Sequence, residues 1–133
     1  MKYHYKKNVS IHEYKMHQLI SNLNIVKTPK IYNYDKKTKI LKLQNLNELD
    51  ISNKYGDNIN NVHSDYINQI RHIILKLYQY GIIYNDITGY NFIEKKEKVW
   101  IIDFEHCQYL PKKCSKFVEE FIDGKNNWNP LFK

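Results

Sequence analysis

Apolar side chains recur every three or four residues in two segments, and this spacing predicts two amphipathic helices. The first helix is expected over residues 11–23, where Ser10 and Glu13 have the spacing of a capping box. The second is expected to start near Val62 and to stop at Gly81, because glycine readily ends a helix. Its apolar positions are Tyr66, Ile70, Ile73, Ile74, Leu77 and Tyr78. We expect this second helix to be mostly buried.

Two β-prone runs lie between these helices, at residues 30–35 and 40–44. The polar residues 36–39 separate them, so the pair is predicted to form a hairpin. The next segment, residues 45–61, is rich in Asn, Asp and Ser, a composition typical of a linker with at most a short helix. We interpret it as a hinge between two small subdomains.

Short apolar runs continue after the second helix and predict strands at residues 82–84, 92–93 and 99–102. A last helix is predicted at residues 114–122. The aromatic tail around Trp128 is expected to fold back onto the core, as aromatic residues at the end of a small domain usually do. Helices and short strands in this order predict an α+β fold.

The length and composition favour one small domain without a membrane segment. The 133 residues are enough for a single core, and no apolar run is long enough to cross a bilayer. We therefore expect a soluble intracellular protein that does not enter a membrane. The two cysteines, Cys107 and Cys114, predict free thiols because they are too few for a disulfide framework.

The net charge of +7 raises the alternative of nucleic-acid binding, because lysine attracts phosphate. The chain has one arginine, Arg71, and is rich in Lys, Asn, Ile and Tyr. Arginine is the residue that contacts phosphate and guanine through two bonds at once, so this composition disfavours a dedicated nucleic-acid surface. A high content of Lys, Asn, Ile and Tyr is typical of an AT-rich genome. We therefore expect a viral or parasite source, with the host cytoplasm as the location if viral.

The candidate chemistry lies after the second helix. Asp86 and Asn91 are five residues apart in a polar loop, and Asp103 follows the apolar run at residues 99–102. Carboxylate and amide oxygens are hard ligands suited to Mg²⁺.

This segment resembles the catalytic loop and metal motif of protein kinases and their relatives, His-Arg-Asp-x-x-x-x-Asn followed by Asp-Phe-Gly. Here the two motifs are Tyr84-Asn85-Asp86 to Asn91, and Asp103-Phe104-Glu105. The form is closest to small atypical kinases, such as the kinase of the KEOPS complex, and to aminoglycoside phosphotransferases. The resemblance covers roughly residues 11 to 110.

The resemblance implies a protein-kinase-like fold with a reduced small lobe at 1–45, a hinge at 46–61 and a minimal helical large lobe at 62–133. It implies Asp86 as catalytic base and Asn91 and Asp103 as Mg²⁺ ligands, with ATP as the nucleotide. Glu13 is a candidate partner of the nucleotide-binding lysine, although its place in the capping box favours a purely structural role.

Several family features are missing from this sequence. The glycines at 56, 81, 89 and 124 are isolated, so there is no Gly-rich loop over the phosphates, and no Val-Ala-Ile-Lys strand is present. Lys2, Lys6 or Lys7 would have to replace that lysine. Tyr84 and Asn85 replace the His and Arg of the motif, so we expect a structural brace to be lost.

Two functions are compatible with these features. The first is a Mg²⁺- and ATP-dependent phosphotransferase, slow or dependent on a partner, acting on a protein hydroxyl. The second is a catalytically dead pseudokinase or kinase mimic that binds and regulates a partner protein. The retained Asp86, Asn91 and Asp103 favour the first.

Overall fold

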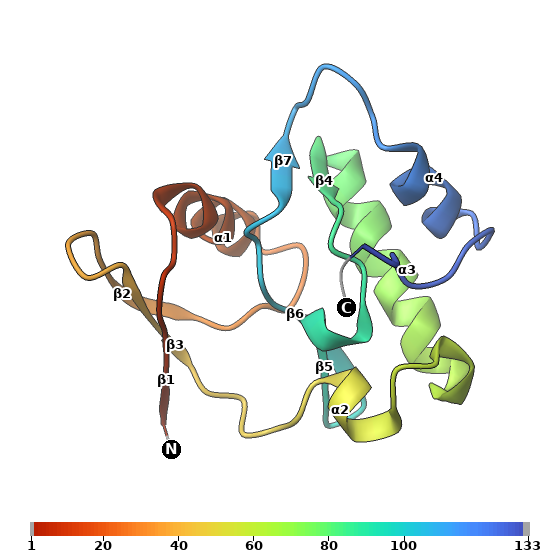
Figure 1. Ribbon diagram of the computed structural model, residues 1–133, viewed down its shortest axis with the longest axis horizontal. Coiled ribbons are helices and arrows are strands. Elements are labelled where there is room, and N and C mark those ends of the chain that lie inside the picture. The colour runs from red at the N-terminus through yellow and green to blue at the C-terminus, as the bar shows by residue number, and fades with distance from the viewer. Residues whose placement is uncertain (1, 132–133) are drawn as a thin grey trace.

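The computed structural model describes residues 2–131 and has an α+β architecture, as the sequence predicts (Figure 1). Within these residues, four α-helices accompany three small antiparallel sheets. The helices are α1 (Ile11–Leu23), α2 (Ile51–Tyr55), α3 (Ser64–Gln79) and α4 (Lys116–Ile122). The strands are β1 (Tyr3–Lys6), β2 (Ile31–Asp35), β3 (Ile40–Gln44), β4 (Ile82–Tyr84), β5 (Phe92–Lys95), β6 (Lys98–Ile101) and β7 (Cys107–Tyr109).

Helix α1 has the predicted bounds, and its ends follow from local chemistry. The Ser10 hydroxyl accepts a hydrogen bond from the Glu13 backbone N–H at 3.1 Å, which satisfies one of the free donors of the first turn. Asn24 ends the helix in the left-handed conformation, which asparagine tolerates better than most residues. Met16 and Ile20 are on its buried face and join the main core.

The predicted hairpin of β2 and β3 is confirmed, and β1 adds a third strand on the other side of β3. The sequence analysis missed β1 because its segment is short and basic. The signal was the alternation of Tyr3 and Tyr5 with His4 and Lys6, which sends the two pairs to opposite faces of the sheet. A small apolar cluster of Val9, Leu41 and Leu43 lies between this sheet and α1, with Tyr14 packed against it.

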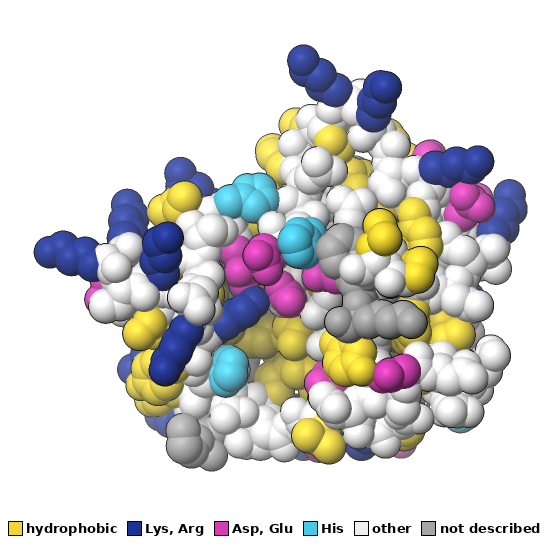
Figure 2. Space-filling view, in the orientation of Figure 1, with side chains coloured by type: hydrophobic (Ala, Val, Ile, Leu, Met, Phe, Trp, Pro, Cys, Tyr) yellow, Lys and Arg dark blue, Asp and Glu magenta, His cyan; other side chains and the backbone are white. Residues whose placement is uncertain are grey.

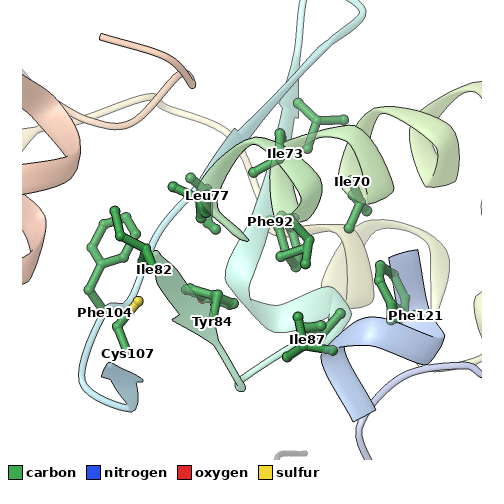
Figure 3. Packing of buried hydrophobic residues seen from close by; sticks show 14 of the residues in the cluster. Ile70, Ile73, Leu77, Ile82, Tyr84, Ile87, Phe92, Phe104, Cys107 and Phe121 are labelled. Carbon is green, nitrogen blue, oxygen red and sulfur yellow. The ribbon is translucent and has the colours of Figure 1, made fainter. Parts of the chain in front are cut away.

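Helix α3 is the centre of the main core, as its apolar pattern predicts. Ile70, Ile74 and Leu77 are fully or almost fully buried. Figure 3 shows this face of α3 directed towards Tyr84 and Phe92 from the strands that follow, with Phe121 of α4 alongside. The predicted strands at 82–84, 92–93 and 99–102 correspond to β4, β5 and β6, and the short strand β7 beside β4 was not predicted.

Residues 45–61 contain the short helix α2 and a 3₁₀ turn at Ile59–Asn61. Ile51 and Ile59 are buried in the main core, so this segment packs with the α3 side of the molecule. The tail folds back as expected, because Trp128 stacks on Phe121 with ring centroids 6.4 Å apart. No helix among residues 2–131 is long and apolar enough to cross a membrane.

Replacing Leu77 with alanine tests the central position of α3. Leu77 is completely buried, so Leu77→Ala removes apolar contacts and leaves a cavity, and should lower the free energy of unfolding by about 2–5 kcal/mol. Urea denaturation measures the change. Gln79→Ala, at an exposed position of the same helix, is the matched control and should change stability little. Equal effects of the two substitutions would contradict the assignment of this core.

Candidate functional site

A charged cluster joins three parts of the chain that are far apart in sequence. The Lys6 ammonium lies 2.5 Å from the Glu13 carboxylate and 3.3 Å from the Asp103 carboxylate. Glu13 is buried, while Lys6 and Asp103 are partly exposed. Figure 2 shows acidic side chains gathered near the centre of this face, above a hollow whose floor is hydrophobic.

Each of the three side chains is placed by a different element. Lys6 is the last residue of β1 and points to the inner face of its sheet, where it is opposite the buried Leu41. Glu13 is in the first turn of α1, and Asp103 follows two residues after β6. The backbone of Asp103 has a φ of 63°, a left-handed conformation that is uncommon outside glycine and is often found at functional sites.

The capping-box interpretation of Glu13 is therefore only half correct. Ser10 does cap α1, but the Glu13 carboxylate accepts a hydrogen bond from Lys6. The sequence favoured a structural role for Glu13 because the spacing to Ser10 was visible, whereas the contact with β1 depends on a strand that the sequence analysis did not predict.

Negative charge exceeds positive charge in this cluster. Carboxylate oxygens of Glu13, Asp103 and Glu105 come within 4.8 Å of one another, around a single lysine. Burial raises the pKa of Glu13, and the nearby charges of Asp103 and Glu105 add to this effect against the opposing effect of Lys6. Burial tends to lower the pKa of Lys6, but Asp103 and Glu13 outweigh it, so this pKa is raised and Lys6 stays charged. These three carboxylates are close enough together that they could hold a metal ion.

Asp86 is buried in the loop after β4. Its backbone carbonyl accepts hydrogen bonds from the Thr88 N–H at 3.0 Å and from the Asn91 side-chain amide at 2.9 Å. These two bonds fix the loop between Asp86 and Asn91. Since the Asn91 nitrogen is used in this way, its side-chain oxygen is the atom left to face a cation.

Burial is also the main reason that the Asp86 carboxyl has a raised pKa, about 6, and the negative charge of Asp103 contributes in the same direction. A carboxylate with a pKa in this range is suited to accept a proton near neutral pH.

The sequence analysis expected the loop before Asp86 to lose a structural brace because Tyr84 stands there. That expectation was wrong, because the Tyr84 side chain itself supports the loop. Its hydroxyl donates a hydrogen bond of 2.6 Å to the carbonyl of Ile102, the residue before Asp103. Its ring is buried against Phe92 and Phe104. Tyr84 thus ties the start of the Asp86 loop to the backbone that carries Asp103.

Asn129 is a residue of the site that the sequence analysis did not identify. Its backbone N–H donates to the Ile87 carbonyl at 2.8 Å, and its side-chain amide donates to the Asn85 carbonyl at 2.9 Å. The two acceptors flank Asp86 in the sequence. Nothing local in the sequence links residue 129 to this loop, although a buried asparagine next to the packed Trp128 is consistent with the tail folding back.

Two histidines of α1 attach the helix to the rest of the site. The Nε2 atom of His12 lies 2.7 Å from the Cys107 carbonyl, and that of the buried His17 lies 2.8 Å from the Pro29 carbonyl. Burial lowers the pKa of His17 to about 4, so this side chain is neutral at physiological pH. These contacts hold the helix that carries Glu13.

A cavity of about 510 Å³ lies beside the charged cluster. Its walls come from β1, β3, α1, the segment before α2 and the residues around Asn91 and Asp103. The polar residues of its lining include His4, Lys6, Glu13, His17, Gln44, Asn45, Glu48, Asp50, Tyr90, Asn91 and Asp103, and the apolar ones include Leu43, Leu46, Leu49, Ile93 and Ile102. A lining that combines apolar side chains with charged groups suits a ligand with an apolar part and an ionic part.

The structure brings together three of the four residues singled out in the sequence. Glu13, Asn91 and Asp103 line the same cavity, and Asp86 lies next to it through its bond to Asn91. Lys6 is the residue of the three lysines named in the sequence analysis that reaches Glu13. Comparisons with protein-family models and with curated proteins found no match for this chain.

The raised pKa of Asp86 predicts a pH-dependent effect of Asp86→Asn on stability. The folded-state pKa of about 6 lies above the reference value of 3.8, so wild type loses stability as the pH rises through this interval and Asp86 ionises in its buried position. The neutral amide avoids this cost. Relative to wild type, Asp86→Asn should gain up to about 3 kcal/mol at pH above about 7 and little at about pH 4.

Urea denaturation at both pH values measures this difference. Asp123→Asn changes an exposed carboxylate and is the matched control, with no comparable pH-dependent gain expected. A gain for Asp86→Asn that is the same at both pH values would contradict the raised pKa.

Proposed function

We propose that this protein is a Mg²⁺- and ATP-dependent phosphotransferase with a reduced protein-kinase-like fold. The observation that carries the proposal is the contact of Lys6 with both Glu13 and Asp103 at the edge of the cavity. Protein kinases depend on an ion pair between a strand lysine and a helix glutamate and on an aspartate that holds Mg²⁺. The arrangement of Lys6 on β1, Glu13 on α1 and Asp103 after β6 matches these three roles.

The sheet with α1 corresponds in this proposal to the small lobe, and α3 with its surroundings corresponds to the large lobe. Residues 46–61 connect the two and supply Leu46, Leu49 and Asp50 to the cavity. The adenine ring of ATP would lie against the apolar part of the lining, and its phosphates would point towards Lys6 and Asp103. The binding energy for the nucleotide would come from both ends of the cavity.

The residues of the chain have separate roles in the transfer. Lys6 would contact the phosphates of the nucleotide, and Glu13 keeps its ammonium in place. Asp103 and Asn91 would hold Mg²⁺, which when bound neutralises negative charge on the phosphates. Asp86 would orient the acceptor hydroxyl of a protein substrate and accept its proton. Tyr84 and Asn129 position the loop that carries Asp86.

Residues 2–131 include no glycine-rich loop that could cover the phosphates of a bound nucleotide. All four glycines, at 56, 81, 89 and 124, lie outside β1, β2 and β3. Each preorganised donor that is missing from a transition-state site typically slows a reaction by about two to three orders of magnitude. We therefore infer a slow enzyme, or one that a partner protein completes.

The pairing of Lys6 with two carboxylates and the missing glycine-rich loop favour a second candidate function, a pseudokinase that binds and regulates a partner protein. Lys6 is already neutralised by two carboxylates, and no glycine loop accompanies it. A protein with this centre could keep the fold for binding alone. Nucleotide binding separates the two candidates.

Calorimetric titration with ATP tests the proposal directly. We expect wild type to bind ATP only weakly without Mg²⁺ and more tightly with it. Asp103→Ala should lose the effect of Mg²⁺, and Lys6→Ala should weaken binding about 10- to 100-fold, because a hydrogen bond to a charged group is worth about 1.5–3 kcal/mol.

Lys37→Ala is the matched control, since Lys37 is exposed in the turn between β2 and β3 and should leave ATP binding unchanged. The absence of any binding at millimolar ATP would overturn the phosphotransferase proposal for this chain and favour the pseudokinase.

The pH dependence of phosphate transfer tests the role of Asp86. With water or the protein itself as acceptor, the rate of phosphate transfer from ATP should rise about tenfold per pH unit below about pH 6 and level off above it, because only the ionised carboxylate accepts a proton. Asp86→Asn should lower the rate by about two to four orders of magnitude.

Asp123→Asn should keep the wild-type profile. A rate that does not change between about pH 5 and 8 would show that Asp86 is not the base.

A further inference from the structure

The positive charge of the protein is concentrated in its first third. Residues 1–45 contain ten lysines and two acidic residues, whereas residues 46–133 contain eleven basic and twelve acidic residues. The net charge of +7 therefore belongs to the part that forms β1, α1, β2 and β3. Codon bias acts on the whole chain and does not account for a difference between its parts.

Tyrosines and lysines lie together on the outer face of the three-stranded sheet. We call this surface the tyrosine–lysine face and define it by Lys2, Tyr3, Tyr5, Lys30, Tyr32 and Lys42. Tyr5 and Tyr32 are 50% and 41% exposed, and Tyr3 contacts Tyr32 edge-to-face with ring centroids 4.9 Å apart. Figure 2 shows hydrophobic and lysine side chains side by side over β1, β2 and β3.

The lysines of this face lie directly against its aromatic rings. The Lys42 ammonium is 4.1 Å from the ring centre of Tyr3 and 5.9 Å from that of Tyr5. Lys2 and Lys30 lie 5.6 Å and 5.3 Å from the rings of Tyr3 and Tyr32. Asp35 is the one acidic residue in the three strands, and its carboxylate accepts hydrogen bonds from the backbone of the adjacent turn.

We propose that the tyrosine–lysine face binds single-stranded nucleic acid. Proteins that bind single strands without sequence preference combine aromatic side chains, on which bases stack, with cations that follow the phosphates. Tyr3 and Tyr5 are two residues apart on one strand, so their rings are separated by roughly 6.6 Å along it, a distance that an extended single strand can match between bases. Lys42 between them is placed to contact a phosphate.

Other anionic partners fit this face less well. Double-stranded DNA hides its bases from a flat sheet and is read in the grooves, mainly by arginine, and the chain has a single arginine. An acidic peptide or an anionic membrane would use the lysines but would not require exposed rings on a flat surface. The alternation of rings and ammonium groups therefore favours a polymer that carries both flat bases and phosphates.

The tyrosine–lysine face is separate from the proposed nucleotide site. Side chains alternate along β1, so Tyr3 and Tyr5 point outward while His4 and Lys6 line the cavity on the other side of the sheet. A nucleic-acid strand bound to the outer face of the sheet would leave the cavity open. The inference goes beyond the proposed phosphotransfer and does not depend on it.

Fluorescence anisotropy with a labelled oligouridylate of about 12 nucleotides tests the proposal on the full chain. Wild type should bind it more tightly than a duplex of the same length. Between about 50 mM and 200 mM salt, the logarithm of the affinity should fall with that of the salt concentration with a slope of about −2, as expected for three lysine–phosphate contacts. Lys42→Gln should reduce this slope by about 0.7.

Substitution of the tyrosines separates stacking from charge. Tyr5→Leu and Tyr32→Leu keep the net charge and should each weaken binding about tenfold, whereas Tyr5→Phe keeps the ring and should bind like wild type. Tyr80→Leu, at an exposed tyrosine beyond the end of α3, is the matched control and should have no effect. Thermal unfolding of each variant shows that it is folded, and Asp103→Ala should bind the oligonucleotide normally.

Four results would overturn the proposal. The first is the absence of oligouridylate binding by folded wild type. The second is equal affinity for the duplex, and the third is unchanged binding by folded Tyr5→Leu and Tyr32→Leu; either would reduce the effect to general attraction by lysines. The fourth is binding to phosphatidylserine vesicles that depends on Tyr5 and Tyr32 as strongly as oligonucleotide binding does, which would assign the face to a membrane surface.

Discussion

The contact of the Lys6 ammonium with Glu13 and Asp103 is the interaction on which the site depends. Lys6 belongs to the sheet, Glu13 to α1 and Asp103 to the segment after β6, so one side chain connects three parts of the chain. Burial of charges is costly, and a buried carboxylate without its partner is strongly destabilising. Glu13 is buried, and the arrangement is therefore retained only if Lys6 stays between the acidic groups.

Short contacts between side chains and backbone carbonyls hold the rest of the site. His12 and His17 bind carbonyls from two sides of α1, Tyr84 binds that of Ile102, and Asn129 binds that of Asn85. The His12 contact joins α1 to β7, and the His17 and Tyr84 contacts each join a helix or strand to a loop. The Asn129 contact joins the tail to the loop that carries Asp86. Each of these hydrogen bonds adds to the order of the loop that it reaches.

The side chains of the three-stranded sheet alternate between its two faces, so that one sheet forms two different surfaces. Along β1 the inward residues take part in the charged cavity, while Tyr3 and Tyr5 face outward among lysines. The period of two in a strand makes this separation automatic, because neighbouring residues cannot share a face. A shift of the pairing between β1 and β3 by one residue would exchange the two surfaces.

The sequence by itself determined the elements whose patterns are local. The periodicity of α1 and α3, the capping by Ser10 and the hairpin of β2 and β3 all depend on residues near one another, so they were predictable with good accuracy. The sequence also singled out Asp86, Asn91 and Asp103, of which Asn91 and Asp103 line one cavity and Asp86 accepts a hydrogen bond from Asn91. Only the tertiary structure decided that Lys6 pairs with Glu13, that Tyr84 braces Ile102 and that Asn129 binds the Asp86 loop. Asn129 and Asn85 are 44 positions apart, and Lys6 also contacts Asp103, which is 97 positions away. No local pattern specifies such distant pairs, because they form only when the core has packed.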